Sequence, residues 1–336
     1  MQNPFTLVFG KSPLESISRL AQTNEIIGSF SSEWMNQQIY MITGVRGSGK
    51  TVMLTDISKH FRKDKDWIVI ELNPDRDLLH SFAAKLYDQK NLKDLFIKAK
   101  LDLSVLGIGV SIEKSNPFFD IENAIQAMLE VVKDKKKRVL ITIDEATSNE
   151  EMKIFASAFQ IFVRNELPVF LLMTGLFENI DALQNEKNLT FLYRAPKVKL
   201  QPLDKGAVKQ KYQEIFGFSS DDALAMADMT KGYPFAFQVL GYLTWQKDGD
   251  YKSVVGMYRQ YLSEYVYDKI WSELSNKDKK ICYGIAETAS GKLSLKTNEF
   301  NPYRDRLKKR GIINCEEHGY VHFVLPEFDE YVLTHV

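Results

Sequence analysis

Short runs of β-branched and apolar residues recur through the first two thirds of the chain, separated by stretches in which apolar residues repeat every three or four positions. The runs fall at 38–43, 67–72, 138–143, 169–173 and 197–200. The middle ones are almost continuously apolar, as strands buried on both faces are. Between them, 78–87 and 121–132 have the spacing of helices that cover a sheet. The pattern predicts an α/β fold around a mostly parallel sheet.

The later part of the chain predicts further domains. The segment 101–114 alternates apolar and polar residues around two glycines, which predicts a β-hairpin inserted into the α/β core. From 205 to 269 the pattern predicts helices with one clear break at Gly232-Tyr-Pro234. Helices followed by two strand-like pieces around Cys315-Glu-Glu-His then predict a winged helix. We expect three domains: an α/β core over 1–203, a helical lid over 204–269 and a winged helix over 270–336.

Composition places the chain among ordinary soluble globular proteins. Lys plus Arg and Asp plus Glu both number 44 in 336 residues, so binding to nucleic acid or a membrane surface would need a local patch. The two cysteines, Cys282 and Cys315, have no metal-binding spacing and suit a reducing compartment. The start resembles no secretory leader, and the longest nearly apolar run, 167–177, is shorter than the roughly 20 residues of a spanning helix. We expect a cytoplasmic protein without a membrane segment.

The strongest chemical signal follows directly on the first predicted strand. Residues 44–51 are Gly-Val-Arg-Gly-Ser-Gly-Lys-Thr, a complete phosphate-loop motif, and the helical stretch 52–60 comes next. Glycines let backbone N–H groups wrap a phosphate, and the helix N-terminus adds the positive end of its dipole. Lys50 would reach the β- and γ-phosphates, and Thr51 would bind Mg²⁺. The nucleotide-binding residues expected here are Arg46, Gly47, Ser48, Gly49, Lys50, Thr51 and Val52.

A second motif completes such a site. The apolar run 138–143 ends in Asp144 and Glu145. Asp144 would hold the metal and its water, and Glu145 would polarise the water that attacks the γ-phosphate. Two acids could also simply lie in solvent at a strand end, but an intact phosphate loop in the same chain favours the catalytic interpretation. The expected cofactors are therefore ATP and Mg²⁺.

Together these motifs resemble those of AAA-type P-loop ATPases, in the group that includes the archaeal ATPases, the Orc/Cdc6-like initiators and the STAND signalling ATPases. The segment from Asn3 to Pro13 is similar to the one that lines the adenine pocket in Orc-like relatives. The resemblance implies contacts to the nucleotide from Phe9, Gly10 and Pro13. Those relatives usually have Gly-Arg where this chain has Ser18-Arg19.

Three more features resemble parts of these ATPases. Thr174, at the end of the fourth predicted strand, is similar to the polar sensor that bonds the γ-phosphate or the attacking water. Arg194 has the position of an arginine finger, which stabilises charge on the γ-phosphate, in trans if the protein oligomerises. The segment Lys231–Leu240 resembles the G-x-P element of STAND proteins, which implies that Tyr233 and Pro234 contact the base or sugar. A strand-end threonine and a surface arginine are also common without any such role.

A basic cluster lies on the helix predicted at 303–310, where a winged helix normally meets DNA. Its members are Arg304, Arg306, Lys308, Lys309 and Arg310. The cluster favours contact with double-stranded DNA. Against it, residues 251–336 contain nine Lys and four Arg but also four Asp and eight Glu, and the tip of the predicted wing holds Glu316 and Glu317. A winged helix that packs or binds a protein partner stays open.

Three functions therefore remain. The first is an ATP-hydrolysing ATPase whose lid and winged helix respond to the nucleotide and that acts on DNA. The second is a STAND-like ATP switch that acts through protein partners or a homo-oligomer. The third is a chain that keeps the nucleotide as a structural cofactor. Glu145 favours the first two, in which the catalytic residues would be Lys50, Glu145, Thr174 and Arg194.

Overall fold

The computed structural model describes residues 2–8, 13–89, 92–99, 101, 120–288, 293–294, 300–315 and 320–335. The chain forms two compact units, which are described separately. The sheet unit comprises Arg19–Thr43 and Met53–Lys199, and the lid unit comprises Met1–Ser18, Gly44–Val52 and Leu200–Val336. The phosphate-loop segment thus belongs, by its contacts, to the lid unit. The hairpin expected at 101–114 lies, apart from Leu101, outside the described residues.

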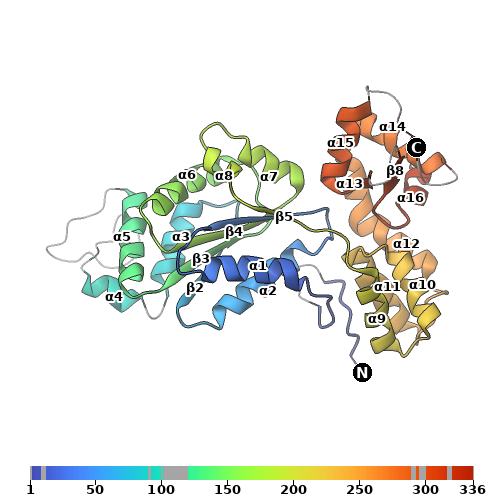
Figure 1. Cartoon of the computed structure of the whole chain (residues 1–336), viewed down its shortest axis with the longest axis horizontal. Helices are drawn as coiled ribbons and strands as arrows, with labels where there is room; N and C mark the ends of the chain where they lie inside the picture. Colours follow the sequence, from blue (N-terminus) through green and yellow to red (C-terminus); the bar gives the residue numbers. More distant parts are fainter. Residues whose placement is uncertain are drawn as a thin grey trace. The chain divides into compact units, whose positions relative to one another are not determined.

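The sheet unit is built on five parallel strands in the order β2-β3-β4-β1-β5 (Figure 1). The strands are β1 Ile39–Thr43, β2 Trp67–Leu72, β3 Arg138–Ile143, β4 Val169–Gly175 and β5 Lys197–Lys199. All five strand predictions are confirmed. Ile143 lies opposite Met173 and Thr43 opposite Gly175, so the carboxyl ends of β3, β4 and β1 meet at one edge of the sheet. The predicted α/β fold with a parallel sheet is therefore correct.

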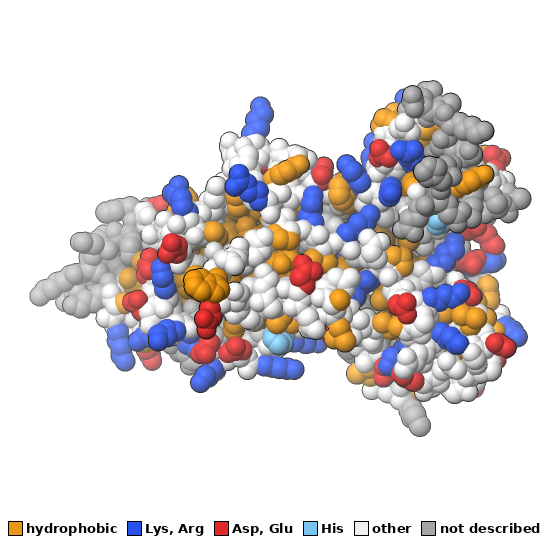
Figure 2. All heavy atoms as spheres, in the orientation of Figure 1, with side chains coloured by type: hydrophobic (Ala, Val, Ile, Leu, Met, Phe, Trp, Pro, Cys, Tyr) orange, Lys and Arg blue, Asp and Glu red, His pale blue; other side chains and the backbone are white. Residues whose placement is uncertain are grey.

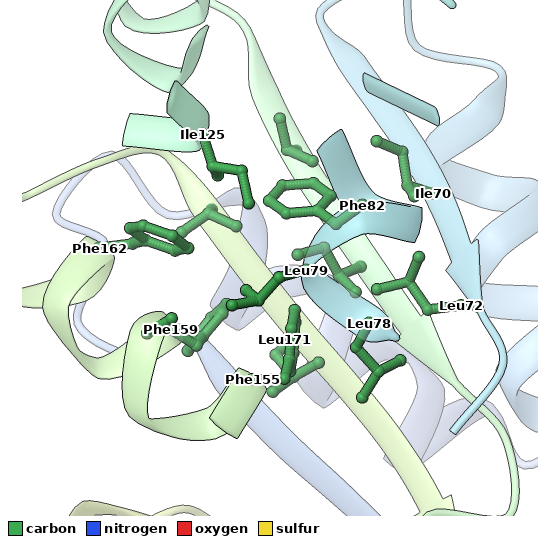
Figure 3. Packing of buried hydrophobic residues seen from close by; sticks show 14 of the residues in the cluster. Ile70, Leu72, Leu78, Leu79, Phe82, Ile125, Phe155, Phe159, Phe162 and Leu171 are labelled. Atoms are coloured by element: carbon green, nitrogen blue, oxygen red, sulfur yellow. The ribbon is translucent and has the colours of Figure 1, made fainter. Parts of the chain in front are cut away.

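Three amphipathic helices cover one face of this sheet: α3 Leu78–Tyr87, α5 Ile121–Asp134 and α6 Glu150–Arg164. Figure 3 shows Phe82, Phe159 and Phe162 turned toward the strands, with Phe155 beside Leu171. All of these side chains are fully buried. Each apolar side chain of this size contributes about 1.5–3 kcal/mol when it leaves water, so this face holds much of the stability of the unit.

Aromatic side chains fill the opposite face, beneath α1 Leu20–Ser31 and α2 Lys50–Arg62. Phe30 contacts Tyr40 and Phe170 with ring centroids 5.5 and 5.3 Å apart. Arg138 lies over Phe170 and donates from Nη1 to the Phe30 carbonyl oxygen at 2.8 Å. Shorter helices complete the unit: α4 Lys93–Lys98, α7 Phe177–Gln184 and α8 Thr190–Tyr193.

The lid unit is helical, as predicted for 205–269. Its helices are α9 Lys205–Phe216, α10 Ser220–Thr230, α11 Pro234–Gln246, α12 Val255–Leu262, the π-helical turn η2 Ser263–Tyr267 and α13 Asp268–Ser272. Pro234 begins α11, where its missing N–H costs nothing. The N-terminal segment is anchored here, because the Phe5 ring packs on Phe237 and lies so close to Gly241 that a side chain there would overlap it.

The C-terminal part of the lid unit contains α14 Asn276–Glu287, β6 Leu293–Ser294, α15 Asn301–Arg310, β7 Ile313–Asn314, β8 Tyr320–Phe323 and α16 Phe328–Thr334. The strands form an antiparallel sheet in the order β6-β8-β7. Helices followed by a hairpin match the pattern expected of a winged helix, whereas α16 was not foreseen. The helical run from Val255 to Ser272 crosses position 269, and the expected domain bounds stay a prediction. Within the described ranges, no helix has both the length and the apolar character to cross a bilayer.

Candidate nucleotide-binding site

The phosphate-loop motif forms a tight turn between β1 and α2. The loop leaves the sheet after Thr43, and α2 begins at Lys50. Gly47 and Gly49 have φ angles of +70° and +89°, which side-chain-bearing residues rarely adopt. A methyl group on Gly47 would also overlap the hydroxyl of Tyr233. The backbone path and the close packing therefore both require glycine at position 47.

Lys50 is held inside this loop. Its Nζ donates to the carbonyl oxygens of Gly44 at 2.9 Å and Val45 at 3.1 Å, and only 9% of the residue is exposed. The first turn of α2 contains no acidic residue. An anion at this helix N-terminus therefore meets a positive dipole end and an ammonium group without a carboxylate in that turn to repel it.

The start of α11 contacts the tip of the loop. The Tyr233 hydroxyl donates to the Arg46 carbonyl oxygen, and the Phe235 N–H donates to the Gly47 carbonyl oxygen at 3.2 Å. Tyr233 is 3% exposed, and its burial raises the pKa of the phenol far above the ordinary value, so the hydroxyl remains a donor. The expectation was that Tyr233 contacts a base or sugar. The structure places its hydroxyl on the loop backbone.

The Arg46 side chain connects the loop to the end of α13. Arg46 Nη2 lies 3.0 Å from Glu273 Oε1, and Arg310 Nη1 donates to the Glu273 carbonyl oxygen at 3.3 Å. About a third of the Arg46 and Glu273 side chains is exposed, so the pair contributes little to stability. The sequence carried no signal for this contact, because 227 positions separate the two residues.

In the sheet unit, the two acids after β3 are fixed by the end of β4. The Thr174 hydroxyl donates to Asp144 Oδ1 and accepts from the Glu145 N–H at 3.2 Å. The Ala146 N–H donates to the Thr174 carbonyl oxygen at 2.7 Å. Thr174 is fully buried. The expected contact with the γ-phosphate or the attacking water stays a prediction, and in this structure the hydroxyl bonds to the Asp144 carboxylate.

Glu145 adopts a conformation that is unusual for a residue with a side chain. Its φ is +56°, in the left-handed region, and its side chain is exposed. Such a conformation costs roughly 1 kcal/mol or more and persists where the surroundings impose it. The N–H of Glu145 bonds to both Asp144 and Thr174, and these bonds hold the strained turn.

The strands that precede the two motifs end at one edge of the sheet. β4 lies between β3 and β1, so Asp144, Thr174 and Thr43 all follow or end adjacent strands. The phosphate-loop segment continues in sequence from Thr43, and the strand that ends at Thr43 pairs with the strand that carries Thr174. This is the order of elements that phosphate-loop chemistry requires.

The remaining predicted nucleotide contacts have varied surroundings. Phe9 and Gly10 lie outside the described residues, and Pro13 is half-buried. Ser48 is buried, whereas Thr51 and Val52 are half-buried in the first turn of α2. Arg194 follows α8 as its C-cap residue, and its exposed side chain bonds to no residue in the described part of the chain.

The predicted DNA cluster on α15 is largely occupied with intramolecular partners. Arg306 forms an ion pair with the buried carboxylate of Asp278, and Arg304 pairs with Asp305 at 3.0 Å. The Arg310 guanidinium is the group that bonds to the Glu273 carbonyl. Lys308 and Lys309 also have interactions within the chain. Several of the charges counted for DNA therefore serve the fold of this domain.

A comparison with known protein families finds two matches in this chain. Residues 27–193 match the model of an ATPase domain found predominantly in Archaea. The segment that contains β1 to β4 and both motifs is therefore similar to that ATPase domain. Residues 264–332 match a second family, a domain of unknown function (DUF8462). No curated protein matches the sequence.

Solved structures share the fold over nearly the whole chain. The Aeropyrum pernix ORC2 protein, in its ADPNP-ADP complexes, is 12% identical with a TM-score of 0.58, over 98% of this chain and 97% of that one. The Cdc6p of Pyrobaculum aerophilum is 12% identical with a TM-score of 0.51, over 98% and 96%. At this identity the likeness establishes the fold alone. The resemblance to Orc/Cdc6-like proteins is thereby confirmed for the fold.

The two motifs fit ATP and Mg²⁺. The glycine-lined loop, the Lys50 ammonium and the N-terminus of α2 suit a polyphosphate. Mg²⁺ needs only one or two protein oxygens where phosphates and water supply the others. The Thr51 hydroxyl and the Asp144 carboxylate, oriented by Thr174, are the oxygens that the motifs offer.

The Thr174 geometry yields a first test. In Thr174→Val the Asp144 carboxylate loses a buried donor, and we expect Mg²⁺-dependent ATP turnover to fall roughly 10- to 100-fold, as when other groups that orient metal ligands are removed. Thr174→Ser keeps the hydroxyl and should retain most of the activity. Titrating Mg²⁺ at saturating ATP checks this. Equal activity of the valine and serine variants would show that the hydroxyl does not orient Asp144.

Proposed function

We propose that this protein binds ATP with Mg²⁺ and hydrolyses it. The observation that carries the proposal is the phosphate loop itself, with Gly47 and Gly49 in the left-handed conformation and Lys50 held within it. The family match over 27–193 supports it, as does the ADPNP and ADP bound by the Aeropyrum pernix protein of the same fold.

The proposed division of labour follows the chemistry of each group. Lys50 would bind the β- and γ-phosphates and Thr51 the metal. Asp144 would hold the metal's water, with Thr174 keeping its carboxylate in place. Glu145 would accept a proton from the attacking water, and its exposed side chain suits that role. Arg194 would act on a neighbouring copy of the chain.

ATP hydrolysis could serve an action on DNA or a switch that acts on a protein partner. The contacts of α15 favour the switch. Arg306, the cluster member with the most bonds, is committed to Asp278 and Ser275. On the face drawn in Figure 2, basic and acidic side chains are interspersed. A duplex DNA site needs cations that are available to phosphates. We therefore propose that nucleotide state is passed to a protein partner or a second copy of the chain.

Steady-state turnover tests the reaction. Glu145→Gln should lower ATP hydrolysis by about 10²- to 10⁴-fold, the contribution of a positioned general base, while ATP still binds. Glu166→Gln is the matched control, because Glu166 is also exposed with a positive φ and lies in the turn after α6, away from the motifs. Duplex DNA, added over a range of salt concentrations, should leave turnover unchanged.

If Glu145→Gln still hydrolyses ATP like the wild type, Glu145 is not the general base. Hydrolysis that rises with DNA at low salt and loses this stimulation as salt increases would instead favour the DNA-linked ATPase, since phosphate contacts release counterions.

Mixing two variants tests Arg194. Lys50→Ala should weaken ATP binding and lower turnover, and Arg194→Ala should lower turnover by about 10³-fold or more if it serves as a finger. If Arg194 acts in trans, the mixture should recover activity, because Lys50→Ala copies supply Arg194 to the intact sites of Arg194→Ala copies. Arg164→Ala, at another exposed helix end, is the control. A fully active Arg194→Ala variant would exclude the finger role.

A further inference from the structure

Four successive carbonyl oxygens of the phosphate loop accept hydrogen bonds. Those of Gly44 and Val45 accept from Lys50 Nζ, that of Arg46 from the Tyr233 hydroxyl and that of Gly47 from the Phe235 N–H. The first two donors come from the motif itself. The last two come from the start of α11 in the lid, nearly two hundred positions further along the chain.

The direction of these carbonyls determines the direction of the loop N–H groups. In a planar trans peptide the C=O of one residue and the N–H of the next point to opposite sides. A donor that holds the Arg46 carbonyl therefore fixes where the Gly47 N–H points. Backbone N–H groups are the groups with which a phosphate loop binds its anion.

Tyr233 is well placed to hold the Arg46 carbonyl. Its side chain is buried in the same hydrophobic cluster as Phe237 and Leu240, and it occupies the N-cap position of α11. Gly47 has no side chain to keep the phenol away, and any side chain there would overlap it. The ring is thus held in the core of the lid unit, and its hydroxyl reaches the loop.

We propose that Tyr233 is a positioning residue for ATP: it holds the Arg46 carbonyl and so sets the loop N–H groups for the phosphates, with no contact to the base. This inference rests on the proposed binding of ATP by the loop. It makes the phosphate affinity of the loop dependent on the start of α11. A shift of this helix would then alter how the loop holds a phosphate.

The test removes one oxygen atom. Tyr233→Phe keeps the buried ring and deletes the donor to Arg46. Tyr258→Phe is the matched control, because Tyr258 is equally buried in the same core and donates to the Met229 carbonyl at 2.9 Å, away from the loop. Both variants should lose similar thermal stability. Affinity is measured for labelled ATP with Mg²⁺ and, by competition, for inorganic tripolyphosphate, which has no base.

We expect Tyr233→Phe to weaken ATP and tripolyphosphate equally, by roughly three- to tenfold for one lost hydrogen bond, while Tyr258→Phe binds both like the wild type. A loss for ATP alone would indicate a base or sugar contact and overturn the inference. The inference would also be overturned if both variants bound the ligands like the wild type, or if both lost the same affinity. A wild-type protein that binds neither ligand would instead contradict the proposed function.

Discussion

A loop that binds phosphate through its backbone N–H groups has to direct its carbonyl oxygens elsewhere, and those oxygens need donors of their own. In this protein Lys50 supplies two of them and the start of the lid helix α11 supplies two more. The requirement explains two otherwise unrelated features, glycine at position 47 and a buried tyrosine just before a helix. The candidate site therefore depends on residues far from its motif.

The acids after β3 obey a similar constraint. A buried or half-buried carboxylate needs donors, and Asp144 obtains them from the Thr174 hydroxyl and the Glu145 backbone. These bonds connect the ends of β3 and β4 and hold Glu145 in the left-handed region. The strained turn lies where the chemistry would take place, a common location for stored backbone strain. Thr174 thus acts on the site through its neighbours in the sheet.

The sequence predicted those parts that depend on local pattern. Continuous apolar runs identified all five strands, and the phosphate-loop and Asp144-Glu145 motifs could be placed because each follows a strand. What it could not provide were contacts between distant positions, such as Tyr233 with Arg46 or Arg46 with Glu273. It also missed α16, a short helix whose buried Phe328, Tyr331 and Val332 have little room to show a period. For α15 the sequence suggested a contact with DNA that the structure does not favour. A charge count cannot reveal that Arg306 already has Asp278 as a partner.

The most direct measurement of the central claim is the affinity for ATP with Mg²⁺ of the wild type, Lys50→Ala and Lys59→Ala. Lys59 is an exposed lysine on the same helix and serves as the matched control. Lys50→Ala should lose about 1.5–3 kcal/mol, or roughly 10- to 150-fold, as expected for charge-assisted bonds to phosphate, and Lys59→Ala should bind like the wild type. Equal affinity in all three proteins would contradict the account, because phosphate would then not be bound by this loop.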